Sequence, residues 1–112
     1  MDESFDIHEI SDNGFPVLAM RGEIDLASAP QLREALTRMN PNETSLVVLD
    51  LSEVTFLDST GLGVLMGALK RARAAGGDIR LVINRPNLLK VFEITGLTTL
   101  FSLFESRSEA CT

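Results

Sequence analysis

Hydrophobic and polar positions follow two different periods along the chain, which predicts a mixture of strands and helices. Residues 5–10 loosely alternate apolar and polar side chains, and residues 17–20 form a second apolar run. Residues 11–14 (Ser-Asp-Asn-Gly) separate them, and Asn and Gly tolerate the positive φ of a tight turn. We therefore expect the first two segments to pair as a β-hairpin.

Three later segments carry apolar residues at the spacing of an amphipathic helix. We expect the first to start at Ser28, with Gln31 completing a capping box, and to stop at residues 40–42 (Asn-Pro-Asn). The second begins near residues 58–61 and runs to about Ala75. Glycine and proline mark the other boundaries: Gly76 and Gly77 after the second helix, Pro86 at the start of the third and Gly96 at its end.

Short apolar runs between these helices predict further strands. Residues 46–49 are continuously apolar and β-branched at their centre, as in a strand that is covered on both faces. Residues 79–83 form the next predicted strand, and residues 100–104 a short last one. Two early strands followed by alternating helices and strands predict an α/β fold with a mixed sheet.

Composition and charge narrow the possible functions. The chain has 112 residues, of which 45% are hydrophobic and 23% charged, as in a globular domain. Its formal net charge of −6 repels phosphate backbones, so we expect no direct nucleic-acid partner. Cys111 is the single cysteine and cannot form an internal disulfide. With no secretory signal and no long apolar run, we expect a cytoplasmic protein without membrane insertion.

An α/β enzyme is one interpretation of this fold class. The glycines at 61, 63 and 67 nearly match a dinucleotide fingerprint, but the third comes one position late. The single histidine, His8, lies in the first predicted strand, where we expect it on the surface. No hydrolytic triad or zinc site can be assembled from this inventory, and Ser59 without a histidine partner is not a nucleophile. We therefore expect no enzymatic activity.

The sequence Asp58-Ser59-Thr60-Gly61 is the most informative stretch, because it joins a buried strand to a helix N-terminus. Sites in α/β folds gather at the carboxyl ends of strands, and helix N-termini favour phosphate. Ser59 therefore occupies a position that can accommodate a phosphoserine. Gly61 and Gly63 lack side chains, which would let a partner's backbone approach. Plain helix capping is the alternative explanation, because Asp, Ser and Thr are preferred caps.

The second predicted helix offers a candidate partner surface. Gly63 and Gly67 lie one turn apart and make a flat strip, with Leu62 and Met66 beside it. Partial exposure of Leu62 and Met66 would make this strip a contact surface for another protein. Tight packing of the strip on the sheet is the alternative.

Residues 50–63 (Asp-Leu-Ser-Glu-Val-Thr-Phe-Leu-Asp-Ser-Thr-Gly-Leu-Gly) closely resemble the phosphorylation segment of STAS-domain anti-sigma factor antagonists. Other family segments match in the same order: Gly-Glu-Ile-Asp at 22–25, Gly-Gly-Asp at 76–78, and Pro-x-x-Leu-x-x-Phe-x-x-x-Gly-Leu at 86–97. The resemblance covers residues 5 to about 104. It implies a mixed sheet with helices packed mainly on one face.

The resemblance also implies a partner switch. In such proteins the serine after the motif aspartate, here Ser59, is phosphorylated by the anti-sigma factor, an ATP-dependent serine kinase. The unphosphorylated form binds this kinase and frees a sigma factor, and a PP2C-type phosphatase resets the switch. The chain itself then needs no cofactor, because ATP is used by the partner. Asp25, Asp58, Thr60 and Gly61 would surround the phosphoacceptor; the two acids would orient the hydroxyl or help hold a nucleotide's metal, or merely cap turns. Thr60 is a second candidate acceptor, though we expect its hydroxyl to bond the backbone.

We expect a single STAS domain over residues 1–112, with residues 105–112 as a polar tail or short helix. Family members end in a longer apolar-faced helix, so this tail predicts weaker coverage of one sheet face. A non-switching STAS interaction module in a lipid-transport or signalling complex is the alternative function; a free-standing chain disfavours a transporter tail. The sequence leaves a monomer or a weak dimer open.

Overall fold

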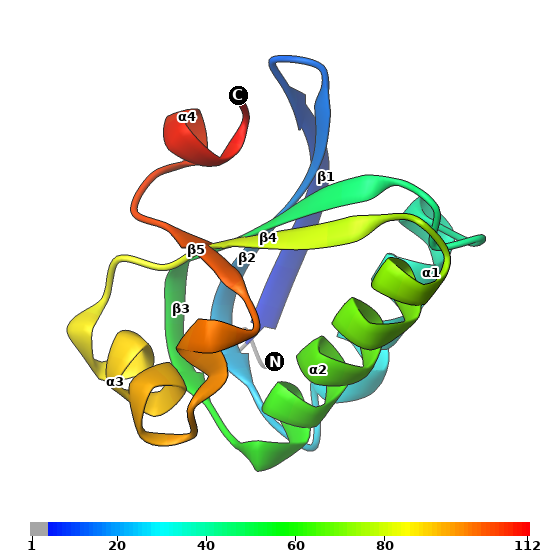
Figure 1. Ribbon diagram of the computed structural model, residues 1–112. Coiled ribbons are helices and arrows are strands. Elements are labelled where there is room, and N and C mark those ends of the chain that lie inside the picture. Colours follow the sequence, from blue (N-terminus) through cyan, green and yellow to red (C-terminus); the bar gives the residue numbers. More distant parts are fainter. Residues whose placement is uncertain (1–4) are drawn as a thin grey trace.

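The protein folds around a five-stranded mixed sheet (Figure 1). The computed structural model describes residues 5–112. The strands lie in the order β1 (Phe5–Asp12), β2 (Phe15–Ile24), β3 (Leu46–Leu57), β4 (Asp78–Val82) and β5 (Ser102–Phe104). The helices are α1 (Ala29–Met39), α2 (Ser59–Ala74), α3 (Pro86–Ile94) and the short α4 (Arg107–Ala110), with a 3₁₀ turn η1 (Leu97–Thr99). No helix among these residues combines the length and the apolar character needed to cross a bilayer.

The predicted hairpin is confirmed. Strands β1 and β2 pair antiparallel from Phe5 opposite Gly22 to Asp12 opposite Phe15. The two residues between them, Asn13 and Gly14, have φ of 53° and 82°. Positive φ at both central positions is the signature of the type I′ turn, whose twist suits a two-residue hairpin.

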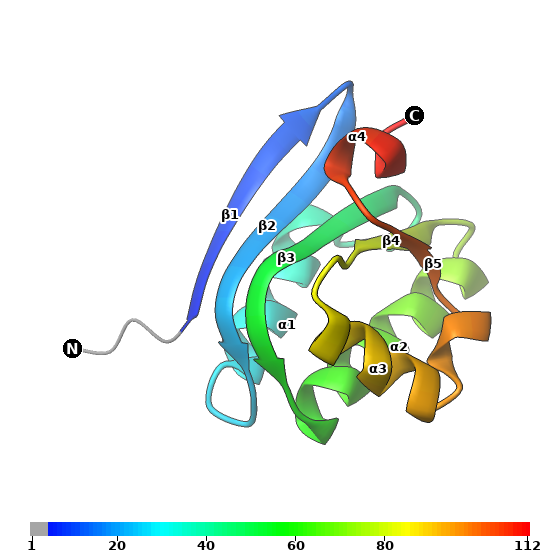
Figure 2. The same cartoon turned by 90° about the vertical axis from the view of Figure 1, so that its left-hand side faces the viewer.

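The order of the parallel strands explains why α1, α2 and α3 share one face. Strands β2 to β5 are parallel neighbours in chain order. Because crossover connections are right-handed, a sheet built stepwise in one direction places every crossover helix on the same side. Figure 2 shows these three helices together on one side of β1, β2 and β3. The predicted α/β fold, a mixed sheet with helices mainly on one face, is confirmed.

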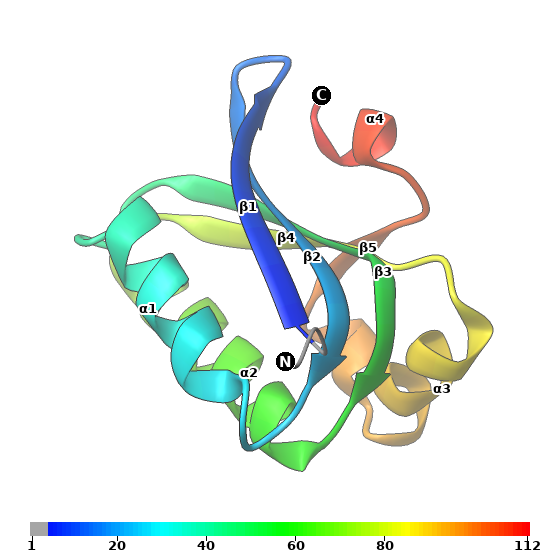
Figure 3. The same ribbon diagram turned by 180° about the vertical axis from the view of Figure 1, so that it is seen from behind.

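Alternation along the strands gives the sheet two apolar faces of unequal size. Leu18, Leu49 and Leu81 are fully buried against the helices. Their strand neighbours, the buried valines Val17, Val48 and Val82, point the other way and form a second, smaller cluster with Ala110 and Cys111. Figures 1 and 3 show α4 across the sheet from α1. The C-terminal segment therefore covers part of the face that the sequence predicted to be weakly covered.

An arginine on β4 fastens this C-terminal segment. The guanidinium of Arg80 donates to the carbonyl of Ala110 at 2.6 Å and lies 5.5 Å from the ring centroids of both Phe15 and Phe104. Hydrogen bonding and cation–π attraction thus act on the same group. The Asn13 side-chain amide, from the hairpin turn, donates to the carbonyl of Cys111 at 2.7 Å. A tail that is polar in sequence is ordered by these tertiary contacts.

Three sequence expectations about local structure were wrong. Strand β3 continues from Leu46 to Leu57, well past the predicted residues 46–49, because β2 pairs with it from Val48 to Leu57. The last strand begins at Ser102, and the 3₁₀ turn η1 precedes it. Ser28 makes no side-chain cap bond to α1, so the capping box with Gln31 is absent. The Ser28 hydroxyl instead donates to the carbonyl of Glu23 at 2.8 Å.

Candidate functional site

The candidate site lies where β2 and β3 end side by side. Ile24 and Leu57 are register partners at the ends of these parallel strands. The backbone N–H of Asp58 extends the pairing by donating to the carbonyl of Ile24 at 3.1 Å. Asp25 and Asp58 therefore begin their two loops at the same edge of the sheet, as predicted. Figures 1 and 3 show the β2–α1 connection and the start of α2 next to each other at this edge.

Asp58 forms the N-cap of α2. Its backbone is extended, and its Oδ1 accepts a hydrogen bond from the N–H of Gly61 at 2.9 Å. Its carbonyl accepts from the N–H of Leu62 at 3.0 Å. Ser59 is thereby fixed as the first residue of the helix, and it is exposed. Within residues 5–112 its hydroxyl has no hydrogen-bond partner, so Ser59 presents a free hydroxyl at a helix N-terminus.

Asp25 also acts as a cap, for the turn that leads into α1. Its Oδ1 accepts from the N–H groups of Ala27 and Ser28, both at 3.0 Å. Its carbonyl accepts from the N–H of Ala29 at 2.8 Å. The capping explanation thus holds for Asp25 and Asp58 alike. Each uses only Oδ1 for these bonds, and a role of either carboxylate toward a phosphoacceptor stays a prediction.

Gly61 serves the interior of the fold. A Cβ built at Gly61 would lie 2.6 Å from Cδ1 of Leu57, 2.7 Å from Cγ2 of Ile24 and 3.0 Å from the Ile24 carbonyl oxygen. Glycine is therefore required for α2 to approach the ends of β2 and β3. The expectation that Gly61 makes room for a partner was wrong. Gly63 is exposed, and a Cβ added there would have no neighbouring atom within 4 Å, so it alone of the two faces open space.

The predicted partner strip on α2 divides into buried and exposed parts. Leu62 is buried at 9% exposure and packs in the core, so its predicted exposure was wrong. A Cβ at Gly67 would lie 3.1 Å from Nη1 of Arg71, whose Nε donates to Glu43 at 2.8 Å. Gly67 thus leaves room for an arginine that ties α2 to the α1–β3 loop. Met66 is half-buried and lines a groove of about 260 Å³ with Leu69, Lys70, Arg73 and Leu100.

Negative charge gathers at this edge without compensation. In the described part of the chain, Glu23, Asp25 and Asp58 take part in no ion pair, and the same is true of six of the eleven other acids there. Thr60 is half-buried, and among residues 5–112 its hydroxyl has no hydrogen-bond partner, contrary to the expectation that it bonds the backbone. Ser59 therefore lies at an edge that carries uncompensated carboxylates on both of its loops.

Comparison with known proteins decides the family. The family model of the STAS domain matches residues 6–110. The chain belongs to the STAS domain family. The anti-sigma-B factor antagonist of Listeria monocytogenes is 40% identical over 82 residues, which are 73% of this chain and 72% of that protein. The anti-sigma-B factor antagonist of Bacillus subtilis is 39% identical over 82 residues, 73% of this chain and 74% of that protein.

A solved structure agrees with these relatives. The crystal structure of an anti-sigma factor antagonist from Mycobacterium paratuberculosis superposes with a TM-score of 0.86 at 29% identity, covering 96% of this chain and 91% of that one. The predicted resemblance of this STAS domain to the anti-sigma factor antagonists is thereby confirmed. The named function of these relatives is regulatory binding rather than catalysis.

Two exposed apolar residues of the STAS domain were not among the predicted site residues. Leu26, in the β2–α1 connection, is 73% exposed, and Phe56, next to the end of β3, is 48% exposed. Phe56 is the register partner of Glu23, one position before Ile24 and Leu57. The sequence did offer a signal for Leu26, because it is an apolar residue outside every predicted strand and outside the apolar stripe of every predicted helix.

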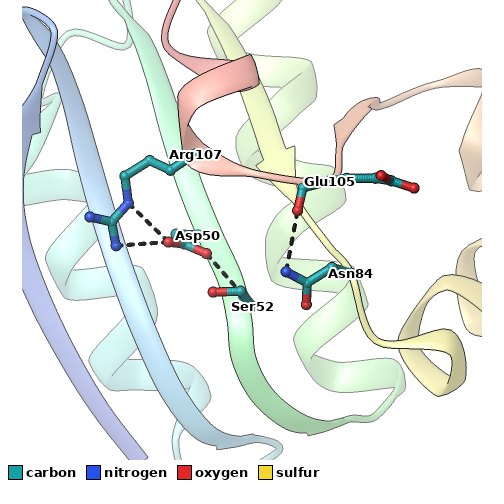
Figure 4. A network of polar contacts seen from close by, with 5 residues as sticks. All are labelled: Asp50, Ser52, Asn84, Glu105 and Arg107. Carbon is teal, nitrogen blue, oxygen red and sulfur yellow. Dashed lines mark hydrogen bonds and ion pairs between the residues drawn. The ribbon is translucent and has the colours of Figure 1, made fainter.

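The STAS domain also holds an ion pair with a buried carboxylate away from this edge, drawn in Figure 4. Oδ2 of Asp50 on β3 accepts from Nε and Nη2 of Arg107, and Oδ1 accepts from the N–H of Ser52 at 2.9 Å. Nearby, the Asn84 amide donates to the Glu105 carbonyl at 3.2 Å. These contacts anchor α4 on the second face of the sheet, and no local sequence pattern predicts them.

Proposed function

We propose that this STAS domain is a phosphorylation-controlled anti-sigma factor antagonist. Its unphosphorylated form binds an anti-sigma factor that is also a serine kinase and so releases a sigma factor. Phosphorylation of Ser59 blocks this binding, and a PP2C-type phosphatase restores it. The observation that carries the proposal is the exposed Ser59 hydroxyl, free of internal hydrogen bonds among residues 5–112, on the first turn of α2.

Local structure makes Ser59 a suitable acceptor. Asp58 already caps α2, so Ser59 can react without giving up a structural bond. A phosphate on the first helical residue lies at the positive end of the helix dipole, which tolerates negative charge. We therefore expect the phosphorylated domain to keep its fold. The switch then acts at the protein–protein interface rather than through a large conformational change.

Electrostatics accounts for the loss of binding. Phosphorylation adds about 1.5 to 2 negative charges. A kinase that transfers phosphate to Ser59 brings its nucleotide's phosphates to that hydroxyl, so phosphoserine meets both like charge and occupied space. An uncompensated charge in a desolvated interface costs on the order of 2–5 kcal/mol. That cost lowers affinity about 30-fold to several thousandfold.

The test uses the purified domain as bait in lysate from its source organism. Wild type, Ser59→Ala, Ser59→Asp and Thr60→Ala are compared, and mass spectrometry identifies the captured proteins and any phosphate on Ser59. We expect wild type, Ser59→Ala and Thr60→Ala to retain an ATP-binding kinase that Ser59→Asp loses. With purified kinase and ATP, phosphate should appear on wild type and Thr60→Ala but not on Ser59→Ala.

The opposite result would indicate the alternative function. If all four forms capture the same transporter or scaffold proteins and Ser59 carries no phosphate, this STAS domain is a non-switching interaction module. The cytoplasmic location, the lack of a direct nucleic-acid partner, the absence of a cofactor and the monomeric or weakly dimeric state stay predictions.

A further inference from the structure

Leu26 is a large apolar residue whose side chain is exposed to solvent. It is 73% exposed and lies between Asp25 and Ala27 in the connection from β2 to α1. Ile94, at the end of α3, is the one described large hydrophobic residue of similar exposure, at 75%. Leu26 therefore offers apolar area to a partner, because covering a leucine side chain contributes about 10-fold or more in affinity.

The turn that carries Leu26 is braced from both sides. Oδ1 of Asp25 accepts from the N–H groups of Ala27 and Ser28, both at 3.0 Å. The buried hydroxyl of Ser28 accepts from the N–H of Asp25 at 2.9 Å and donates to the carbonyl of Glu23 at 2.8 Å. Leu26 thus projects from a backbone whose neighbours on both sides are hydrogen-bonded. A partner that covers it has little loop entropy to overcome, which favours affinity.

The surroundings of Leu26 indicate the chemistry of that partner. Asp25 directly precedes Leu26, and Glu23 lies two positions before Asp25 on β2. Neither acid forms an ion pair with the described residues, so both lack compensation by a cation from that part of the chain. The bond from the Asp58 N–H to the Ile24 carbonyl joins this turn to the start of α2, where Ser59 lies. Figures 1 and 3 show the two loops together, with α3 off to one side. An apolar residue with acidic neighbours complements an apolar pocket with a basic rim.

We propose that Leu26 is the apolar anchor of the partner interface at the Ser59 edge. It inserts into an apolar pocket of the anti-sigma factor, and Lys or Arg side chains on the pocket rim face Glu23. Ser59 then faces the nucleotide, a short distance along the same edge. This inference rests on the proposed function. It adds that Leu26 supplies much of the affinity and that the partner's surface is an apolar pocket with basic residues on its rim.

The experiment measures the dissociation constant of the purified, Ser59-sensitive kinase for variants of the whole domain by calorimetry. Leu26→Ala should raise the dissociation constant at least about 10-fold, as truncation of a buried anchor does. Leu26→Met should stay within about 3-fold of wild type, because it keeps the apolar volume. Ile94→Ala is the matched control for exposure and should stay within about 2-fold. All variants should unfold within about 3 °C of wild type, because these side chains are exposed.

A second arm tests the basic rim by association kinetics at several salt concentrations. Glu23→Gln should lower the association rate at low salt by about 2- to 5-fold and flatten its salt dependence. Glu93→Gln, an exposed acid on α3 with no ion pair among residues 5–112, is the control and should change neither.

The outcomes separate this inference from the function it rests on. If Ser59→Asp abolishes binding but Leu26→Ala stays within about 2-fold of wild type, the switch stands and the anchor is wrong. An Ile94→Ala effect as large as that of Leu26→Ala also overturns the anchor, because exposure alone would then explain it. An unchanged rate for Glu23→Gln overturns the basic rim. If no Ser59-sensitive partner exists, the proposed function and this inference both fail.

Discussion

Asp50 and Arg107 join the centre of the sheet to the C-terminal helix across 57 positions of sequence. Oδ2 of Asp50 accepts from Nε of Arg107 at 3.0 Å and from Nη2 at 2.8 Å, while the Asp50 side chain is only 6% exposed. A buried carboxylate requires such a partner. This pair, with the Arg80 contacts, lets a short polar tail serve as part of the core.

Removal of Arg107 should therefore destabilise the domain by more than its exposure suggests. Arg107→Ala leaves a buried carboxylate unpaired, and we expect a loss of about 1–3 kcal/mol after allowing for the partly exposed arginine. Arg38→Ala is the control: it breaks the Arg38–Glu9 pair, whose side chains are 58% and 41% exposed. That change should cost about 0.5 kcal/mol or less. Urea unfolding measures both, and equal losses would contradict a special role for the Asp50 pair.

Gly61 and Gly63 should respond oppositely to a methyl group. Gly61→Ala forces a Cβ against Ile24 and Leu57, including a backbone oxygen that cannot rotate away, so we expect a loss of about 1–3 kcal/mol. Gly63→Ala enters open space in a helix interior, so helix propensity should raise stability by about 0.5–1 kcal/mol. Thermal unfolding of the two variants against wild type decides the matter. If Gly61→Ala is as stable as wild type, the ends of β2 and β3 can shift to accommodate the added methyl group.

Substitutions at Asp58 and Ser59 should show that Asp58 stabilises α2 as its cap, whereas Ser59 is not needed for stability. Asp58→Ala removes the acceptor for the Gly61 N–H and should cost about 1 kcal/mol, whereas Asp58→Asn keeps an acceptor oxygen and should cost less. Ser59→Asp places a negative charge on the first helical residue, so stability should stay equal or rise by about 0.3–1 kcal/mol. Chemical unfolding checks all three. A destabilised Ser59→Asp would remove it as a faithful mimic of the phosphorylated form.

Cys111 should be a slow thiol in the folded domain. Its side chain is 1% exposed, and burial raises its pKa, with the negative charge of Asp12 acting in the same direction. The native thiol thus keeps its proton at pH values where an unfolded one, with a pKa of about 8.5, loses it. Labelling with a thiol reagent at about pH 8 should be slow in buffer and fast in urea.

The same shift predicts how stability depends on pH. Above the pKa of the unfolded thiol, the unfolded chain binds fewer protons than the native one, so the free energy of unfolding falls as pH rises. Wild type should therefore lose more stability between about pH 8 and 10 than Cys111→Ala does. Comparing slopes rather than absolute values removes the effect of the deleted sulfur atom. Parallel slopes would show that the buried thiol contributes nothing to the pH dependence.

Local patterns were enough to predict most of the framework. The Asn13-Gly14 turn specified the hairpin, since its positive φ values need no distant contact. Helical spacing, Pro86 and Gly96 defined α2 and α3, and the segment from Asp50 to Gly63 indicated the family and the position of Ser59. Each of these features depends on residues close in sequence, so a local pattern was sufficient to predict it. The family resemblance implied that Asp25 and Asp58 lie near Ser59.

Tertiary structure decided what depends on residues far apart in sequence. The local pattern at Gly61 indicates an opening for a partner, but Ile24, 37 positions earlier by residue number, makes it a packing glycine. Arg107 gains its role only when α4 meets β3. Such side chains acquire their roles through contacts that form once the sheet has assembled, and a local pattern carries no record of them.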